Sequence, residues 1–291
     1  MAYVRLTDMR FSPNDKVEYA HKWGDMILDA LKSLGISANC VKFSTNTNIS
    51  SVYQANGIPE WVNTISSTSR YKGASSTQMR VYCNTCIWFI VDNIKYAIII
   101  GNGAGGGELG IDFCSTIYES TSTDISSNLT YRHTGGSTGT MGYTNKRDYM
   151  LIGYGDGGFH MTFRRDSLST SYYMYAGHCR TSFNDSVFTP IFDLINQKPV
   201  HASMGNQLVV GSLAAAMATS INDAVGDVIT KKYYAFDIFI GIYQGTIFGT
   251  LKNVFCIPYA SGSYLGDVFT SGGENYMYLY TINNHKVFAR V

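Results

Sequence analysis

Short runs of branched and aromatic residues, separated by glycine and small polar residues, recur along most of this chain. The clearest runs are Ile87–Val91 and Tyr96–Ile100, which flank Asp92-Asn93. Branched and aromatic side chains pack well on a pleated sheet, and Asp and Asn tolerate the positive φ of a tight turn. The pattern therefore predicts a β-hairpin. Because Tyr96–Ile100 is apolar without alternation, we expect this strand to be covered on both faces.

One segment near the N-terminus has helical periodicity instead. Apolar residues recur at steps of three and four along it: Val17, Ala20, Trp23, Ile27, Leu31 and Leu34. Ser12 is a candidate N-cap, Pro13 suits the first helical position, and Gly35 is a typical C-terminal stop. We therefore expect an amphipathic helix over Pro13–Leu34 that packs on the sheet.

Strand-like segments account for most of the remaining chain. The predicted strands are Tyr3–Thr7, Asn39–Ser44, Ile111–Tyr118, Asn128–Arg132, Tyr149–Tyr154, Phe159–Arg165, Ser171–His178, Tyr233–Tyr243, Thr246–Ile257, Tyr276–Ile282 and Val287–Val291. Pro59 favours a helical turn over Ile58–Val62, and a small apolar stretch predicts a short second helix near residues 213–224. The fold class expected is α+β and β-dominated, with mostly antiparallel sheets in a sandwich or barrel-like arrangement.

Two connections affect the domain organisation. Residues 133–146 are rich in glycine and nearly devoid of apolar side chains, which predicts a long exposed loop that either contacts a neighbouring subunit or acts as a lid. The segment from Pro190 to Pro199 predicts a crossing between two lobes. Residues 1–198 would form a helix-plus-antiparallel-sheet lobe with glycine-rich loops, and residues 199–291 a β-rich lobe, although one continuous domain is also compatible with the pattern.

Composition narrows the function classes. Only 15% of the 291 residues are charged, the formal net charge is +1, and the chain contains 22 Tyr. A nucleic-acid-binding protein would show a basic stripe, which this sequence lacks. The charged N-terminus argues against a secretion signal, and no apolar run has the ~18 residues of a membrane span. Low charge with many tyrosines suggests a soluble protein whose surface is partly covered by neighbours.

The glycine-rich run after the predicted hairpin invites a nucleotide-binding interpretation. Gly101-Asn102-Gly103-Ala104-Gly105-Gly106 matches the dinucleotide fingerprint, which needs a helix to begin at once so that its N-terminal amides meet the phosphates. The sequence that follows alternates at Leu109, Ile111 and Phe113, which favours another strand. We therefore interpret the run as a close-packed β loop and expect no bound nucleotide.

Other candidate chemistry is sparse. Six cysteines lie scattered along the chain, and Cys83-Asn84-Thr85-Cys86 is a lone CxxC; zinc would need two more ligands, for instance His178-Cys179. Buried, reduced thiols are the default, with a metal at Cys83 and Cys86 left as an alternative. His160 and His178 fall on predicted strands without a nucleophile and carboxylate that spacing can group with them. They are interpreted as hydrogen-bonded sheet residues.

The C-terminal third carries a family resemblance. Gly249–Cys256 is followed by Gly266-Asp267-Val268-Phe269, then by Gly272-Gly273-Glu274-Asn275-Tyr276-Met277, and by a final strand ending in Val287-Phe288-Ala289-Arg290. This order resembles the closing segment of virion structural proteins of tailed bacteriophages, over roughly the last 45 residues in pattern and over the rest in style. The resemblance implies a non-enzymatic subunit of the tail, neck or baseplate that is assembled in the host cytoplasm and carried in the virion.

The functional expectation follows from this resemblance and from the composition. We expect no catalytic, cofactor-binding or metal-binding residues, and the partners expected are copies of this chain and other virion proteins. A membrane, sequence-specific nucleic acid and a small-molecule substrate are not expected. The alternative is a glycan-binding or glycan-cleaving β-rich protein, with Asp112, Glu119 and Asp156 as the acidic candidates; a glycosidase needs two carboxylates about 5–10 Å apart.

Overall fold

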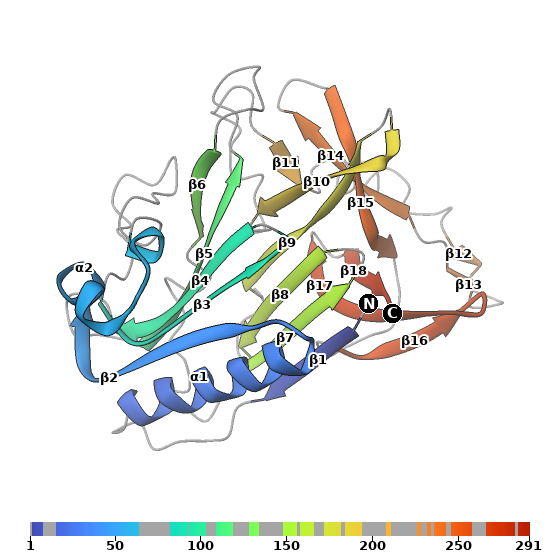
Figure 1. The fold of residues 1–291 in the computed structure, drawn as a ribbon. Coiled ribbons are helices and arrows are strands. Elements are labelled where there is room, and N and C mark those ends of the chain that lie inside the picture. The colour runs from blue at the N-terminus through green and yellow to red at the C-terminus, as the bar shows by residue number, and fades with distance from the viewer. Residues whose placement is uncertain are drawn as a thin grey trace.

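The computed structural model describes most of the predicted elements. The described residues are 2–7, 16–63, 82–92, 94–102, 109–118, 128–133, 148–155, 158–165, 172–181, 184–193, 208–210, 226–227, 232–233, 236–242, 246–257, 266–282 and 285–291. The fold is strand-rich with few helices, and every strand pair described is antiparallel, as the sequence predicts (Figure 1).

The strands form two main sheets. The small sheet has five strands in chain order: β2 (Ala38–Asn48), β3 (Tyr82–Val91), β4 (Ile94–Asn102), β5 (Leu109–Tyr118) and β6 (Asn128–His133). The large sheet has 11 strands, whose main path is β1 (Ala2–Thr7), β7 (Asp148–Gly155), β8 (Gly158–Arg165), β9 (Tyr172–Thr181), β15 (Thr246–Ile257), β18 (His285–Arg290), β17 (Glu274–Ile282) and β16 (Val268–Ser271).

Shorter strands branch from this path. In the large sheet, β10 (Asn184–Asp193) pairs with β9, and β14 (Phe236–Ile242) joins β15 to β11 (Leu208–Val210). A separate pair is formed by β12 (Gly226–Asp227) and β13 (Lys232–Tyr233). In the described part of the chain, β1 and β16 do not pair with each other, so the large sheet is not a closed barrel.

The predicted central hairpin is confirmed. Val91 of β3 pairs with Ile94 of β4 across a two-residue connection, and Asp92 has a φ of 51°. Positive φ is the conformation that a tight hairpin turn requires and that Asp adopts more readily than most residues. β3 and β4 lie in the middle of the small sheet between β2 and β5, so the local turn chemistry and the apolar runs together position the centre of this layer.

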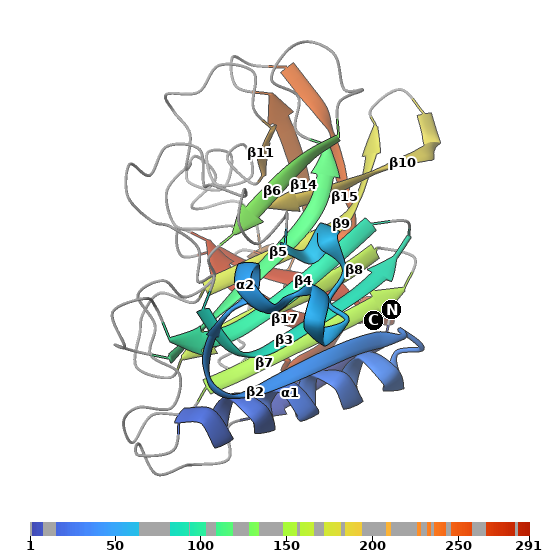
Figure 2. The same cartoon turned by 60° about the vertical axis from the view of Figure 1, so that its left-hand side comes forward.

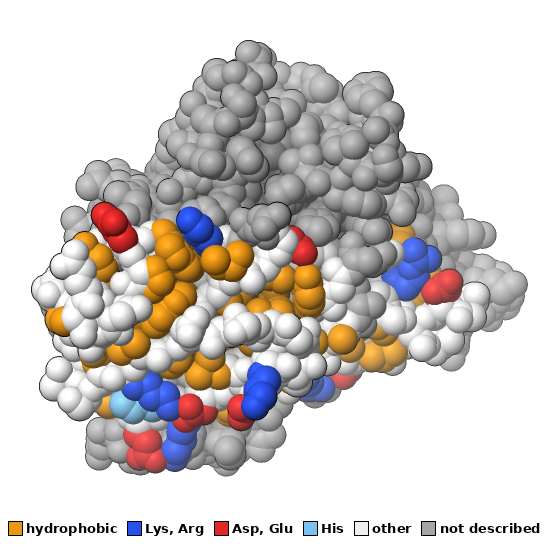
Figure 3. Space-filling view, in the orientation of Figure 1, with side chains coloured by type: hydrophobic (Ala, Val, Ile, Leu, Met, Phe, Trp, Pro, Cys, Tyr) orange, Lys and Arg blue, Asp and Glu red, His pale blue; other side chains and the backbone are white. Residues whose placement is uncertain are grey.

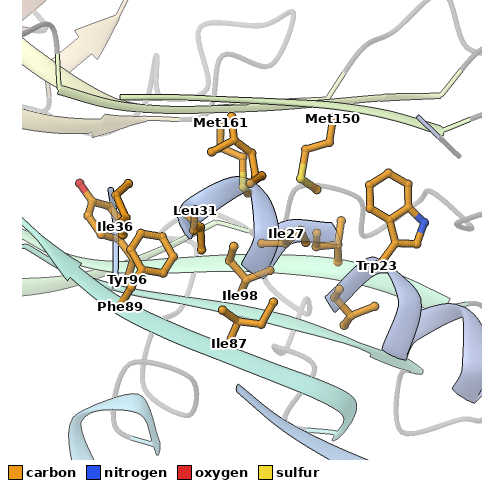
Figure 4. Close-up of a cluster of buried hydrophobic side chains, with 14 of the residues drawn as sticks. Trp23, Ile27, Leu31, Ile36, Ile87, Phe89, Tyr96, Ile98, Met150 and Met161 are labelled. Atoms are coloured by element: carbon orange, nitrogen blue, oxygen red, sulfur yellow. The ribbon is translucent and has the colours of Figure 1, made fainter. Parts of the chain in front are cut away.

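The main core lies between the two sheets. Figure 4 shows Met150 and Met161 extending from the large sheet toward Ile87 and Ile98 of the small sheet, with side chains of the first helix filling the space beside them. That helix, α1 (Lys16–Ser33), contributes the buried residues Tyr19, Ala20, Trp23, Ile27, Ala30 and Leu31. It runs along β2 at the border of the two layers (Figure 2). The predicted helix stripe therefore faces the core.

The opposite face of the small sheet is also covered. Cys86 and Trp88 of β3 and Ala97 and Ile99 of β4 pack against a segment that contains α2 (Ile49–Val52), the 3-10 turn η1 (Gln54–Asn56) and a helical turn at residues 60–63. Pro59 accepts the first bond of that turn from the amide of Val62, as the sequence predicts. The expectation that Tyr96–Ile100 is covered on both faces is confirmed, because all five residues are buried.

The C-terminal end of α1 follows its sequence signal. Gly35 has a φ of 76°, its amide donates to the carbonyl of Lys32, and the amide of Ile36 donates to the carbonyl of Leu31. These two bonds are the Schellman arrangement, which satisfies carbonyls that the helix leaves unpaired. Of the predicted start, Ser12 and Pro13 lie outside the described residues.

One prediction about the chain path is wrong, and several lie outside the described residues. The crossing predicted from Pro190 to Pro199 is wrong for its first residues, because Pro190 lies within β10, opposite His178 of β9; residues 194–199 lie outside the described residues. Proline lacks an amide donor and is tolerated on edge strands, and β10 pairs only with β9 among the described strands. The helix near 213–224 and residues 134–146 of the long loop are not among the described residues. The division at residue 198 stays a prediction; β15 and β18 share the large sheet with β9.

The two termini of the chain lie next to each other (Figure 1). β1 begins the large sheet, and the segment before β16 approaches it: Arg5 lies 3.8 Å from a carboxylate oxygen of Asp267. A side chain at Gly266 would contact the Arg5 stem and Leu151. The large sheet therefore curls until its two ends touch through side chains. No described helix is both long and apolar enough to cross a membrane.

Candidate interaction surface

Buried polar side chains are one class of candidate site residue in this protein. Among the described residues, the buried polar ones are Asn84, Thr85 and His160. His160 is only 1% exposed, and its Nδ1 lies 3.2 Å from the hydroxyl of Tyr3. Gly153 stands between them in the register of β1, β7 and β8, and a Cβ there would meet the Tyr3 ring at 2.2 Å. Tyr3 thus lies across Gly153 to reach His160, which fits the predicted role of a hydrogen-bonded sheet residue.

The thiols lie in apolar surroundings. Cys83 and Cys86 are fully buried beside Ile49, Ile58 and Val62, and neither forms a disulfide. Burial raises the pKa of Cys83 far above its ordinary value, with a smaller contribution from the nearby Cys40. A metal ligand must be a thiolate, which this environment disfavours. No group of three metal-ligating side chains occurs among the described residues.

The other candidate residues from the sequence form no further cluster in the described part of the chain. Asp112 lies on β5 opposite Ile99 of β4, while Glu119 and Asp156 lie outside the described residues. His178 is on β9, opposite Pro190. Of the glycine run, Gly101 and Asn102 end β4 and residues 103–106 are not described. The next described element is β5, which pairs antiparallel with β4, so this is a β–β connection and not the strand–helix unit that a dinucleotide site needs.

The end of the large sheet at β16 has a different character. β16 and β17 form a hairpin whose turn contains Gly272 and Gly273, with φ values of 61° and 83°. Positive φ at both central residues is the I′ geometry that suits a two-residue hairpin. At the other end of β16, the amide of Gly266 donates to the carbonyl of Tyr278, and the amide of Tyr278 donates to Asp267. With a φ of 85° at Gly266, this is a G1 β-bulge.

These bonds fix which backbone groups of β16 face outward. Asp267 accepts from β17, and in an antiparallel pair the groups that bond to the neighbour alternate along the strand. Phe269 and Ser271 therefore bond to β17, whereas the amides and carbonyls of Val268 and Thr270 point away from it. Among the described strands, nothing pairs with that outer side of β16. Val268 and Thr270 also have exposed side chains, with Val268 at 53%.

The edge strand β2 of the small sheet is protected. β2 borders the small sheet, and its register with β3 shifts between Lys42 and Thr47, which marks an irregularity of the kind that interrupts pairing. The ring of His21 on α1 donates from Nε2 to the carbonyl of Phe43 at 3.1 Å, and Lys42 pairs with Asp25 of the same helix. Bulges, lysines and covering helices are the usual means by which proteins block a sheet edge. In the part of the chain that the structure describes, β16 has none of these between Val268 and Thr270.

The charges around β16 are balanced. Arg5 pairs with Asp267 at one end of the strand, and Arg290 lies 3.9 Å from Glu274 at the other. Arg290 also donates to the side-chain oxygen of Asn253 at 2.9 Å, which holds the guanidinium in place. Figure 3 shows a mixed cluster of basic and acidic side chains along the lower border of the described part of this face, and a basic next to an acidic side chain near its right-hand end. The β16 edge is thus neutral as well as open.

Sequence reasoning did not identify this edge. A signal was present, because Gly272-Gly273 between short apolar and alternating segments is a two-residue hairpin pattern. That β16 would be the last strand of its sheet depends on the neighbours of β17, which the local pattern does not reveal.

Comparisons with known proteins found no family model, no curated protein and no solved structure that matches the chain.

Proposed function

We propose that the protein is a non-enzymatic structural subunit of a phage particle, contributing to the tail, neck or baseplate through protein–protein contacts. The observation that carries this proposal is the β16 edge, which is open, neutral and apolar at Val268. A free protein usually blocks such an edge, because unpaired strand groups bind other strands. An assembly subunit can instead pair this edge with a strand of a neighbouring subunit. Low overall charge and abundant tyrosine also suit a chain whose surface is covered by neighbours.

The partners proposed are copies of this chain and other virion proteins. The protein would be assembled in the host cytoplasm and carried in the virion. A small molecule, a membrane and sequence-specific nucleic acid have no part in this function.

The test is the size and shape of the purified protein. Light scattering after size exclusion gives the mass over a range of concentrations, and negative-stain imaging gives the shape of any assembly. We expect rings, tubes or association with phage particles in a lysate of the infected host. A strictly monomeric protein that binds an oligosaccharide and joins no assembly contradicts the proposal.

A glycan-binding β-rich protein is the second candidate, because one surface site resembles a sugar platform. Trp61 is half-buried, and the Lys95 ammonium lies 5.7 Å from its ring centroid. Ile90, paired with Lys95 in the hairpin, is 54% exposed. Of the three tryptophans, Trp23 and Trp88 are buried, so a fluorescence change on oligosaccharide addition would report on Trp61. If this candidate is correct, Trp61→Ala abolishes binding while assembly is absent in both proteins.

A further inference from the structure

The outer side of β16 offers a defined row of backbone groups. The amides and carbonyls of Val268 and Thr270 point away from β17, as the G1 bulge and the hairpin register require. A strand laid along this side can exchange hydrogen bonds with both residues. The bulge at Gly266 and the turn at Gly272 limit the pairing to the length of β16. The site therefore fits one short, extended segment.

We propose that this segment is β16 of a second copy of this chain, paired antiparallel about a two-fold axis at Phe269. This inference rests on the proposed function, since it names the contact through which the subunit would associate with itself. In this register, Val268 lies opposite the partner's Thr270, and Thr270 lies opposite the partner's Val268. Both pairs exchange their outward amide and carbonyl bonds, so the edge that each copy leaves open is closed by the other.

Charge favours a copy as the occupant. A two-fold axis brings identical surfaces together, so a net charge along the edge would repel. Here Arg5 with Asp267 and Arg290 with Glu274 leave both ends neutral. The register also places Asp267 opposite the partner's Ser271, next to the turn that carries the partner's ion pair.

The side chains are compatible with this register on both faces. Val268 and Thr270 are exposed on one face and would meet their counterparts as directly opposed pairs. On the other face, Phe269 stacks on Tyr276 and meets Phe288 edge-on, and it is only partly buried. Pairing brings it opposite the partner's Phe269 at a non-hydrogen-bonded position, where side chains come closest. Two aromatic clusters would then join across the axis.

The pairing is short, so a single contact is weak and depends on repetition. Interfaces below ~1,200 Å² belong to weak or transient complexes. In an assembly with several contacts per subunit, later contacts form at high effective concentration. We therefore expect self-association through β16 to rise steeply with protein concentration.

Cysteine cross-linking tests the register directly. Val268→Cys and Thr270→Cys are prepared as separate full-length proteins and mixed under mild oxidation. In the proposed register their Cα atoms lie ~5.5 Å apart, within the range of a disulfide. Two copies of either variant alone place the cysteines diagonally, at ~7–8 Å, where a bridge is disfavoured. We expect the mixture to give at least ten times more covalent dimer than either variant alone. The two further controls are the wild type and a mixture of Asn275→Cys with Val268→Cys, and each should give as little dimer as a single variant.

A lysine pair tests the surface without cysteine chemistry. Val268→Lys places a charge on the contact in both copies, whereas Asn275→Lys places the same charge on the same exposed face one strand further in. We expect at least a tenfold rise in the concentration needed for association with Val268→Lys and no more than a twofold change with Asn275→Lys. Circular dichroism confirms that both variants are folded.

The outcomes separate the two proposals. Assemblies that form equally well with Val268→Lys and give no selective cross-link overturn the β16 contact and leave the structural function standing. A wild-type protein that is monomeric at every concentration and gives no cross-link overturns both. Selective loss of binding to another virion protein, with self-association unchanged, assigns the edge to a different occupant and overturns pairing between copies.

Discussion

β4 and β16 are both strands rich in branched and aromatic residues, yet β4 is enclosed on all sides and β16 is not. In β4, Tyr96 to Ile100 are all buried, with the α1 core on one face and the α2 segment on the other. β4 also has a strand on each side. β16 has β17 on one side only, and its exposed side chains include a branched one, Val268.

The difference shows which strand is enclosed by its own chain and which has a side left for a partner. Around β4 every direction is filled by the chain itself, so substitutions there should change stability. Around β16 one direction is open, so substitutions on its outer side should change association and leave stability nearly unaffected.

The largest effect is expected from a cavity in the closed region. Ile98→Ala removes buried methyl groups from β4 at a position with no exposed surface. Large-to-alanine changes at such sites lower the free energy of unfolding by about 2–5 kcal/mol. Chemical denaturation measures the loss, and Val268→Ala in β16 is the control, expected within ~0.5 kcal/mol of wild type. Similar losses at the two sites would show that β16 is as enclosed as β4.

A smaller loss is expected where backbones approach closely. A side chain at Gly101 would meet the Cα of Cys83 at 2.4 Å and the carbonyl oxygen of Tyr82 at 2.5 Å. Because both are backbone atoms of β3, Gly101→Ala must shift the small sheet, at a cost of about 1–3 kcal/mol. Gly272→Ala serves as the comparison: it meets no atom within 4 Å but sits at a φ of 61°. Its cost, ~1 kcal/mol, should come from conformation alone.

The two glycine variants respond differently to a second change. Gly272→Asn should restore stability, because Asn tolerates positive φ, whereas Gly101→Asn should be worse than Gly101→Ala. Equal behaviour at both sites would contradict the close approach at Gly101. Thermal unfolding monitored by circular dichroism is sufficient to rank the variants.

Alkaline pH should weaken the folded state modestly through the thiols. Burial raises the pKa of Cys40 from its ordinary 9.0 to about 11, with Lys42 opposing this and Asp25 adding to it. A raised pKa means that the folded state favours the protonated thiol. The resulting stability is present below pH 9 and is lost as pH rises toward 11. The free energy of unfolding should therefore fall across this window.

Substitution of the thiol isolates its share. Cys40→Ala should make the fall in stability between pH 9 and 11 shallower, whatever its effect at neutral pH, while the buried Cys83 thiol accounts for a slope that remains. Tyr154→Phe is measured for comparison. Because burial and the hydrogen bond to Asp92 also raise the pKa of Tyr154, its removal should reduce the alkaline loss of stability by a separate share. An unchanged slope in Cys40→Ala would show that this thiol ionises as readily in the folded state as in the unfolded one.

The smallest effect on stability is expected on the outer side of β16. Thr270→Pro removes an amide that points away from β17, so the ladder of the hairpin stays intact. We expect the free energy of unfolding to change by no more than about 1 kcal/mol, while self-association is lost. Thr270→Val keeps the amide and should retain association. A large loss of stability in Thr270→Pro would show that this amide is bonded within the subunit.

The helix and the central hairpin were predictable because local chemistry specifies them. Gly35 has the positive φ that a helix stop requires, and Asp92 has the positive φ of the hairpin turn. The course of Pro190 was not predictable, because proline ends a central strand but fits an edge strand, and which of the two applies depends on distant pairing partners. His160 was correctly interpreted as a sheet residue, although its contact with Tyr3 across Gly153 needed the register of three strands.

By itself, then, the sequence determined most of the longer strands, where α1 ends, and that Tyr96–Ile100 is covered on both faces. Periodicity and turn chemistry act over a few residues and are visible in the chain. Only the tertiary structure decided that β4 is closed in by two layers, that β2 is blocked by α1, and that β16 is the last strand of the large sheet. An edge is defined by the strand that is missing beside it, and strand neighbours are set by contacts between residues far apart in the chain.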